Sequence, residues 1–244
     1  MIAADQPTYF PDDVIVKVSS RGDGSVLDRP VGIHSPDMVT NRTKFCEANG
    51  VSYGDVVFQR IVYDEARSYE LIAEVDAGST TKFTSEVVAD ALFTRSKNVG
   101  LLLPVADCAA TVVYDPVHHF LALAHLGRHS TLTNLVARLV GHFVMSGSKA
   151  EDLVVWMGPS AKRETYRLEW FDRADDVVWQ SFFDKKDDGY YLDLPGYNHQ
   201  QFTRAGVSPN NIHVSPVDTV SNLDYFSHSG GETAERIAVL AMMR

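Results

Sequence analysis

One cysteine and one histidine near the middle of the chain have the residue types and the spacing to form a reactive site. Cys108 closes an Ala-Asp-Cys stretch, and His125 follows seventeen residues later in an Ala-His-Leu-Gly stretch. Each is predicted to lie at a strand end, and strand ends of one sheet can meet at its rim, where pockets commonly form. A thiol beside an imidazole can act as a nucleophile with its general base, or both can bind a metal ion. A buried thiol with a structural histidine is the simpler alternative.

Three further side chains could take part in such chemistry. Asp107, next to the cysteine, could carry a proton or orient the pocket, or be a buried, hydrogen-bonded carboxylate. His129 lies four residues after His125, so both imidazoles could face one metal ion together with Cys108, or His129 could be a solvated residue near a helix start. Arg21, in a Ser-Arg-Gly-Asp-Gly turn, could hold an anion beside glycine-rich backbone or be an ordinary turn residue.

The elements that must position these residues alternate unevenly between strands and helices. We predict strands over 14–18, 56–63, 101–103, 110–114, 120–125, 152–157, 190–194 and 212–214, and helices over 36–49, 130–143, 172–183, 198–205 and 232–243. Ser130 is the expected N-cap of the second helix, whose positive end would favour a thiolate or an anion near His125. Because neighbouring strands cluster in the middle, an α/β fold with a mixed sheet is expected.

The bulk properties fit one globular domain over residues 1–244. Hydrophobic residues make up 45% and charged residues 22% of the 244 positions. The formal net charge is −10, spread along the chain, which disfavours nucleic acid as a partner but allows a small anionic substrate.

The cysteine content and the N-terminus point to a cytoplasmic protein. Cys46, expected in the core, and Cys108 lie in segments of different character and are read as thiols in a reducing compartment. No secretion signal is visible at the N-terminus, and no apolar run reaches the roughly 18 residues that span a bilayer, so no membrane partner is expected.

The motifs resemble the central signature of the laccase-domain (YfiH-like) family. That family has Ala-Asp-Ala-Leu-x-Thr, then Ala-Asp-Cys, then Ala-His-x-Gly-Trp-Arg-Gly; here 89–94 read Ala-Asp-Ala-Leu-Phe-Thr, followed by the stretches of Cys108 and His125. Segments 20–25, 158–160, 218–219 and 225–227 are similar to its flanking motifs. Arg236 matches an arginine of its last helix.

The resemblance implies a layered α/β fold, a mixed β-sheet sandwich with helices on the outside. It also implies a pocket in which a cysteine and two histidines bind zinc or copper. The implied activity is that of a purine nucleoside phosphorylase, with adenosine deamination and an older attribution of polyphenol oxidation. A metal-bound water could attack C6 of adenine, and a phosphate held by arginine, with Arg21 and Arg236 as candidates, could attack C1′ of the ribose.

This sequence departs from the family at three pocket positions. The family's first histidine lies in Gln-Val-His-Gly, and the matching stretch here is Gln-Arg-Ile-Val, which places Ile61 at the ligand position. The Trp-Arg pair after the second histidine is replaced by Arg128 and His129, and the C-terminal Ser-Tyr-Arg-Arg by Ser-His-Ser-Gly over 227–230. Isoleucine cannot bind a metal, which leaves the zinc or copper site open to question.

Three hypotheses follow. The first is a purine nucleoside phosphorylase with altered metal use. The second is a metal-free hydrolase or transferase with Cys108 as nucleophile and His125 as base. The third is a degenerate member that binds a ligand and catalyses nothing. Loss of a ligand at Ile61 favours the second and third.

Overall fold

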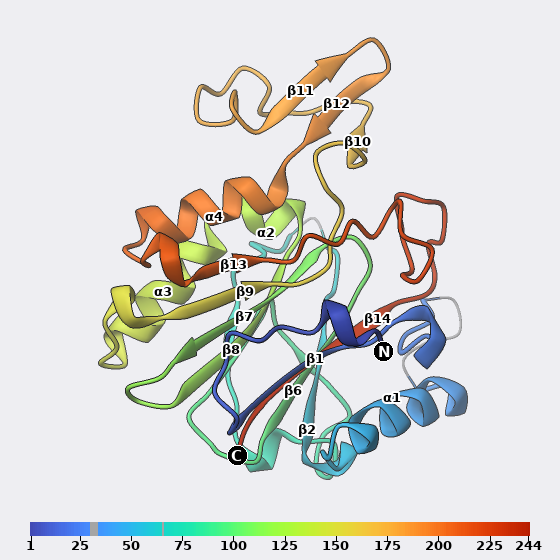
Figure 1. The fold of residues 1–244 in the computed structure, drawn as a ribbon, viewed down its shortest axis with the longest axis vertical. Coiled ribbons are helices and arrows are strands. Elements are labelled where there is room, and N and C mark those ends of the chain that lie inside the picture. The colour runs from blue at the N-terminus through green and yellow to red at the C-terminus, as the bar shows by residue number, and fades with distance from the viewer. Residues whose placement is uncertain (30–33, 65) are drawn as a thin grey trace.

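Two mixed β-sheets packed face to face form the centre of the protein (Figure 1). The computed structural model describes residues 1–29, 34–64 and 66–244. The first sheet has five strands, in the order β1 (Val14–Val18), β14 (Ile237–Met243), β6 (Gly100–Val105), β2 (Val56–Arg60) and β4 (Val87–Val88). The second has six, in the order β13 (Ile212–Val214), β9 (Val154–Met157), β7 (Ala109–Asp115), β8 (Phe120–Leu126), β5 (Ala91–Thr94) and β3 (Ile72–Glu74).

Both sheets mix parallel and antiparallel pairs, as the sequence predicted. In the first, β6 pairs in parallel with β2 and antiparallel with β14. In the second, β9 pairs in parallel with β13 and antiparallel with β7. The main core lies between the sheets and includes Val16 of β1, Leu103 of β6 and Leu123 of β8.

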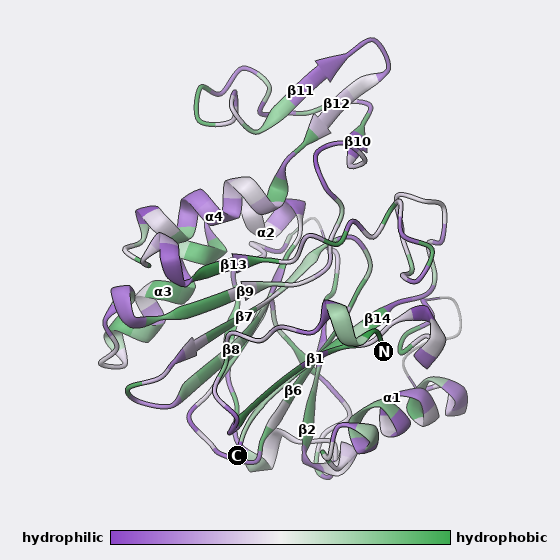
Figure 2. Ribbon diagram, viewed as in Figure 1, coloured by the Kyte–Doolittle hydropathy of each residue, from purple (hydrophilic) through white to green (hydrophobic). Residues whose placement is uncertain are grey.

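Helices cover the outer faces and complete a four-layer sandwich. The helix α1 (Pro36–Ala48) packs outside the first sheet, where Phe45 meets Phe58 and Leu240. The helices α3 (Leu135–Met145) and α4 (Leu194–Arg204) pack outside the second sheet. Figure 2 shows the strands as largely hydrophobic, whereas α1 and α4 also carry hydrophilic residues. The fold class expected from the sequence is confirmed.

A small third sheet projects beyond the helices (Figure 1). It consists of β10 (Arg167–Leu168), β12 (Gly189–Leu192) and β11 (Phe183–Lys186). We call residues 162–193 the arm. Its own apolar cluster includes Phe171 and Trp179, and the Trp179 ring stacks on Tyr197 of α4 at 3.7 Å between centroids. The arm is thereby attached to the main body through α4.

Short helices make up the remaining elements. The α-helix α2 (Arg128–Leu132) follows β8, and the 3-10 helices are η1 (Ala3–Asp5), η2 (Arg21–Asp23), η3 (Tyr53–Asp55), η4 (Ala77–Ser79), η5 (Ala150–Asp152) and η6 (Pro209–Asn211). Among the described residues, the helices are all too short or too polar to cross a membrane.

The helix predicted over 232–243 is wrong, because residues 237–243 form the central strand β14. Side chains of this strand alternate between the two faces of the sheet. Val239 faces the core between the sheets, whereas Leu240 faces the cluster under α1. A strand buried on both faces carries no polar positions that would reveal its period of two, and sheet pairing overrides its helix propensity. Arg236, expected on a helix, precedes this strand.

Three other helix predictions need correction. The segment over 172–183 forms turns that lead into β11, and its Trp179 packs with the preceding Phe171 in the arm cluster. The helix expected from Ser130 to residue 143 is two helices, α2 and α3, because Asn134 between them has a left-handed φ of 62°. The helix expected from residue 198 begins earlier, at Leu194, after the cap formed by the Asp193 carboxylate.

Candidate active site

Strand register brings Cys108 and His125 together. The strands β7 and β8 are antiparallel with Ala110 opposite His125, and Cys108 lies two residues before Ala110, in the turn from β6 to β7. A Cβ placed on Gly127 would lie 2.7 Å from Sγ of Cys108 and 2.9 Å from Cε1 of His125. Because both atoms lie within 3 Å of this one position, the Cys108 thiol and the His125 ring are close neighbours. The structure therefore makes the juxtaposition that the sequence predicted.

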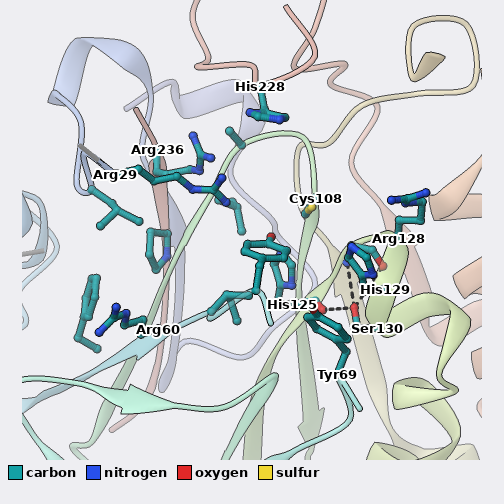
Figure 3. A pocket seen from close by; sticks show the side chains of 18 of the residues that line it. Arg29, Arg60, Tyr69, Cys108, His125, Arg128, His129, Ser130, His228 and Arg236 are labelled. Carbon is teal, nitrogen blue, oxygen red and sulfur yellow. Dashed lines mark hydrogen bonds between the residues drawn. The ribbon is translucent and has the colours of Figure 1, made fainter. Parts of the chain in front are cut away.

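Both side chains line a cavity of about 290 Å³ (Figure 3). Its walls combine aromatic rings with cationic groups. The lining includes Phe58, Tyr63, Tyr69, Tyr166, Arg29, Arg60, Arg128, Arg236, His125, His129 and His228. A concave site with aromatic walls and a few convergent polar groups is typical of small-molecule binding.

The charge of the cavity is opposite to that of the chain. Four arginines line it, and among the described lining residues there is neither an aspartate nor a glutamate. The chain as a whole carries a formal charge of −10. One of the arginines, Arg60, is paired with Glu86 at 2.6 Å. The concentration of positive charge in an acidic protein indicates an anionic ligand.

Two of the arginines, Arg29 and Arg236, are brought together by the chain ends. Residues 26–29 run antiparallel to 234–236, with a bridge between Asp28 and Glu235. Burial lowers the pKa of Arg236, and Arg29 lowers it further. The Arg29 guanidinium lies 5.0 Å from the Tyr63 ring centroid. Neither arginine forms an ion pair with a carboxylate of the described residues, so both are available to an anion.

Burial keeps the thiol and the imidazole neutral. It raises the pKa of Cys108 to about 12, and the charge of Asp107 adds to the rise. It lowers the pKa of His125 to about 4, and Arg236 and Arg29 contribute in the same direction. At neutral pH the pair is thus a thiol and an uncharged ring rather than a thiolate and an imidazolium. A neutral imidazole can still donate one N–H and accept one hydrogen bond.

Asp107 holds the turn that carries the cysteine. Its φ is 69°, a left-handed conformation that is uncommon outside glycine. Its carboxylate accepts hydrogen bonds from Oγ1 of Thr219 at 2.7 Å and from the backbone N–H of Ser229 at 2.6 Å. Asp107 is buried and is not part of the cavity lining. Its position favours an orienting role over the proton-carrying role.

Arg21 lies outside the site. Its guanidinium forms a bidentate ion pair with Glu232, at 2.6 and 2.7 Å, and also donates to the backbone carbonyls of Leu223 and Tyr225. It does not line the cavity. With its donors engaged in this way, Arg21 ties residues 223–232 to η2, and the structure does not bring it to the predicted anion. Of the two predicted anion ligands, only Arg236 reaches the cavity.

His129 reaches the cavity wall but is engaged with aromatic rings. It stacks on Tyr69 with 4.6 Å between centroids and a 22° interplanar angle. Within the described part of the chain, no three His, Cys, Asp or Glu side chains are grouped so that they could hold a metal ion. The predicted trio of Cys108, His125 and His129 is therefore not assembled as a three-ligand set.

Several lining residues escaped the sequence analysis. Arg29, Tyr63, Tyr69 and Tyr166 belong to no motif, and no signal in the sequence pointed to them. His228 was noted only as part of a departure from the family pattern. It enters the cavity because Asp107 holds the neighbouring Ser229.

The family model of the multi-copper polyphenol oxidoreductase laccase matches residues 27–244. The chain belongs to this family. A purine nucleoside phosphorylase, YlmD, of Bacillus subtilis (strain 168) is 25% identical over 239 residues, covering 90% of this chain and 85% of the relative. The purine nucleoside phosphorylase ORF3 of Streptomyces griseus is 26% identical over 219 residues, covering 88% and 83%.

Two solved structures share the fold of this chain. The crystal structure of YlmD from Geobacillus stearothermophilus has a TM-score of 0.82 at 23% identity, covering 98% of this chain and 94% of that one. The crystal structure of Bacillus licheniformis hypothetical protein YfiH has a TM-score of 0.81 at 23% identity, covering 96% and 94%.

The side chains of this laccase-family member do not fit the zinc or copper site that the family resemblance implies. Ile61 lines the cavity at the position expected for the first histidine. The thiol, which binds metals as a thiolate, has its pKa raised by burial. Arg29 and Arg236 place positive charge beside the same pair, as the lowered pKa of His125 reflects. A cavity built in this way suits an anion better than a divalent cation.

Proposed function

We propose that this chain is an enzyme of the purine nucleoside phosphorylase type, acting on nucleosides such as adenosine and inosine with phosphate as the second substrate. The observation that carries the proposal is the Arg29–Arg236 pair beside Cys108 and His125, in a cavity whose described lining lacks carboxylates. The names of the distant relatives in Bacillus subtilis and Streptomyces griseus support the same reaction class.

The reaction exchanges one bond for another at the sugar. A phosphate oxygen bonds to C1′ of the ribose while the C1′–N9 bond breaks. The electron pair of the broken bond goes to the purine, which takes up a proton from water and leaves as the free base, and the sugar leaves as ribose 1-phosphate. Positioning of the two reactants and stabilisation of charge are what such a site must supply.

Each group of the cavity has a part in this proposal. Arg29 and Arg236 hold the phosphate, because guanidinium groups bind phosphate oxygens in pairs. The rings of Tyr63 and Tyr69 offer faces for the purine. His125, as a neutral imidazole, donates a hydrogen bond to the departing base and keeps its own proton, because the base is protonated by water. Cys108 packs beside it, and Asp107 fixes the turn that presents the thiol.

We do not extend the proposal to adenosine deamination or polyphenol oxidation. The sequence analysis linked deamination to a metal-bound water, and the donor set around Cys108 does not fit that ion. The alternative of a Cys108 nucleophile with His125 as base needs a thiolate, whereas burial raises the pKa of this thiol to about 12. The remaining alternative is a protein that binds nucleosides without catalysis. The following test distinguishes it from an enzyme.

The test is purine release from inosine and adenosine, measured by chromatography with and without phosphate. We expect release that requires phosphate and yields ribose 1-phosphate. Arg236→Gln should raise the KM for phosphate about 10- to 100-fold, the effect of losing hydrogen bonds to a charged group, about 1.5–3 kcal/mol. Arg21→Gln removes the same charge outside the cavity and should leave that KM unchanged. Release without phosphate, or no release at all, would contradict the proposal.

A further inference from the structure

A second hollow lies beside the cavity, under the arm. This groove has a volume of about 650 Å³ and is walled by β10 and β12 of the arm on one side and the 228–229 segment on the other. Arg128, Tyr166 and His228 line both the cavity and the groove. The two spaces are therefore adjacent, and these three side chains form their common wall.

Arg128 is the uncommitted cation at this junction. In the cavity, Arg60 is paired with Glu86, and in the groove Arg167 is paired with Asp188 at 3.2 Å. Arg128 forms no ion pair or hydrogen bond with its side chain among the described residues. A guanidinium at the wall of two adjacent hollows, with no protein partner there, is suited to an anionic ligand group.

The junction is separate from the phosphate position proposed above. In Figure 3, Arg29 and Arg236 lie on one side of Cys108, and Arg128 lies on the other. The cavity thus offers two cationic positions with the reactive pair between them. A phosphate held at the arginine pair and a second anion held at Arg128 can be bound at the same time, because separate cations offset their repulsion.

We propose that the substrate is a purine nucleoside 5′-phosphate, whose 5′-phosphate binds Arg128 and His228 at the junction while inorganic phosphate occupies the Arg29–Arg236 pair. This inference rests on the proposed phosphorolysis and deepens it by naming the substrate class. In a nucleoside, the 5′ position lies at the end of the ribose away from the base. It is the point at which an anionic group can be added without disturbing C1′.

The experiment compares the binding of adenosine and AMP by titration calorimetry at saturating sulfate, which takes the place of inorganic phosphate without supporting turnover. We expect AMP to bind at least about tenfold more tightly than adenosine, the effect of one charge-assisted hydrogen bond, about 1.5 kcal/mol. Arg128→Gln should remove this advantage, and Arg128→Lys should keep part of it. Arg138→Gln, on α3 and paired with Glu70, changes the charge equally away from both hollows and should keep all of it.

Saturating sulfate decides where AMP binds. If the AMP phosphate occupies the Arg29–Arg236 pair instead, sulfate will compete with it and the advantage over adenosine will vanish, which overturns the inference. Equal affinities without sulfate, or an advantage that survives Arg128→Gln, would also overturn it.

Turnover separates this inference from the proposed function. Phosphate-dependent release of adenine from adenosine but not from AMP would support the proposed phosphorylase activity and contradict the proposal that the substrate is a nucleoside 5′-phosphate. If AMP binds more tightly than adenosine in a way that depends on Arg128, but no adenine is released from either compound, the proposed ligand class is supported and the proposed phosphorylase activity is contradicted. Faster phosphate-dependent release from AMP, slowed by Arg128→Gln, would support both.

Discussion

We expect Ile61 to decide what kind of ion the cavity accepts. It follows β2 directly, lines the cavity and packs against the core between the sheets. A histidine there would place a second imidazole on the wall that Cys108 and His125 share. The aliphatic side chain provides no donor atom, and the nearby arginine pair favours anions. One position in the sequence thereby accounts for much of the departure from the family's metal chemistry.

Restoring the histidine tests this view. We expect Ile61→His to bind zinc at close to one ion per chain, because three protein ligands suffice for a site that keeps water as the fourth. The unaltered protein should retain well under one ion after the same zinc incubation and gel filtration, measured by elemental analysis. Ile61→Phe is the matched control, with a ring but no nitrogen, and should behave like the unaltered protein. Stoichiometric zinc in the unaltered protein would refute the argument.

The sequence located the centre of the candidate site but not its walls. Cys108 and His125 could be placed together because each ends a recognisable segment, and Ile61 because a motif surrounds it. Arg29 could not, since it reaches the cavity only through the pairing of residues 26–29 with 234–236. Arg21 was wrongly predicted to bind the anion, because its ion-pair partner Glu232 is 211 residues away in the sequence. Such long-range pairings leave no local pattern.

At the scale of elements, the end of β8 and the start of α2 depend on Gly127. The Ser130 hydroxyl donates to the carbonyl of His125 at 2.6 Å and accepts from the N–H of Gly127 at 3.1 Å, which closes the strand-to-helix turn. Cys108 and His125 then fill the space in front of the glycine. The absence of a Cβ is what allows both side chains to be there.

Gly127→Ala should therefore damage the site more than the fold. The added carbon would lie within 3 Å of both Sγ and the ring, and we expect overpacking to cost about 1–3 kcal/mol while phosphate affinity falls. Gly141→Ala is the control, because its Cβ would meet open space on α3 and should stabilise the protein by up to about 1 kcal/mol. Thermal unfolding and phosphate titration give the two readouts. Unchanged phosphate affinity in Gly127→Ala would contradict the packing argument.

The turn between β7 and β8 is held by a buried carboxylate. Asp115 accepts hydrogen bonds from Ser148, from the ring of His118 at 2.8 Å and from the N–H of Val117 at 2.7 Å. Burial alone would raise the pKa of Asp115, but these hydrogen bonds outweigh it and lower the pKa below its usual value. The charged form thus stabilises the folded state above the unfolded pKa of about 4, and this contribution is lost as the pH falls through the lower folded value.

Asp115→Asn should reveal this dependence. At pH 7 we expect a loss of about 1–3 kcal/mol in the free energy of unfolding, because hydrogen bonds to a charged acceptor are weakened. The difference between variant and unaltered protein should shrink as the pH is lowered below about 4. Denaturant titrations between pH 7 and pH 3 measure it. Glu74→Gln, at a half-exposed ion pair with Arg95, should change stability by less than about 1 kcal/mol. A difference that is constant with pH would exclude the charge as the cause.

Elements with a clear start or stop signal, or with one apolar face, were predicted better than elements without such a pattern. The helix α1 was recognised by Pro36 at its start and the Asn-Gly stop after it, and the amphipathic face of α3 by the spacing of its leucines. The prediction for β14 was wrong because both faces of this strand are buried. Its sequence Ile-Ala-Val-Leu-Ala-Met-Met therefore shows neither the two-residue period of a strand nor the 3.6-residue period of a helix. The arm failed because its aromatic residues serve a local cluster of turns rather than a helix face.

At the scale of the molecule, the protein combines a rigid sandwich with a small attached arm. The two sheets and their helices bury the main core clusters, whereas the arm has its own, separate one. The cavity opens among the ends of β6, β7 and β8, and the groove lies between this rim and the arm. The chemistry proposed for the cavity therefore depends on the sandwich, and the extension of the ligand depends on the arm.

This division predicts that the arm can be loosened separately. Trp179 is 2% exposed and stacks on Tyr197, so Trp179→Ala should cost about 3–5 kcal/mol of local stability. Amide hydrogen exchange should rise over residues 166–192 and stay unchanged over 100–126, because a separate cluster can open without the core. Trp170→Ala is the control, since this tryptophan of the same arm is 68% exposed and should alter neither region. The loosened arm should weaken AMP binding at the groove while inorganic phosphate, held by Arg29 and Arg236, binds as before. Equal exchange in arm and sandwich would show instead that the two unfold together, and the groove could then not be tuned independently of the cavity.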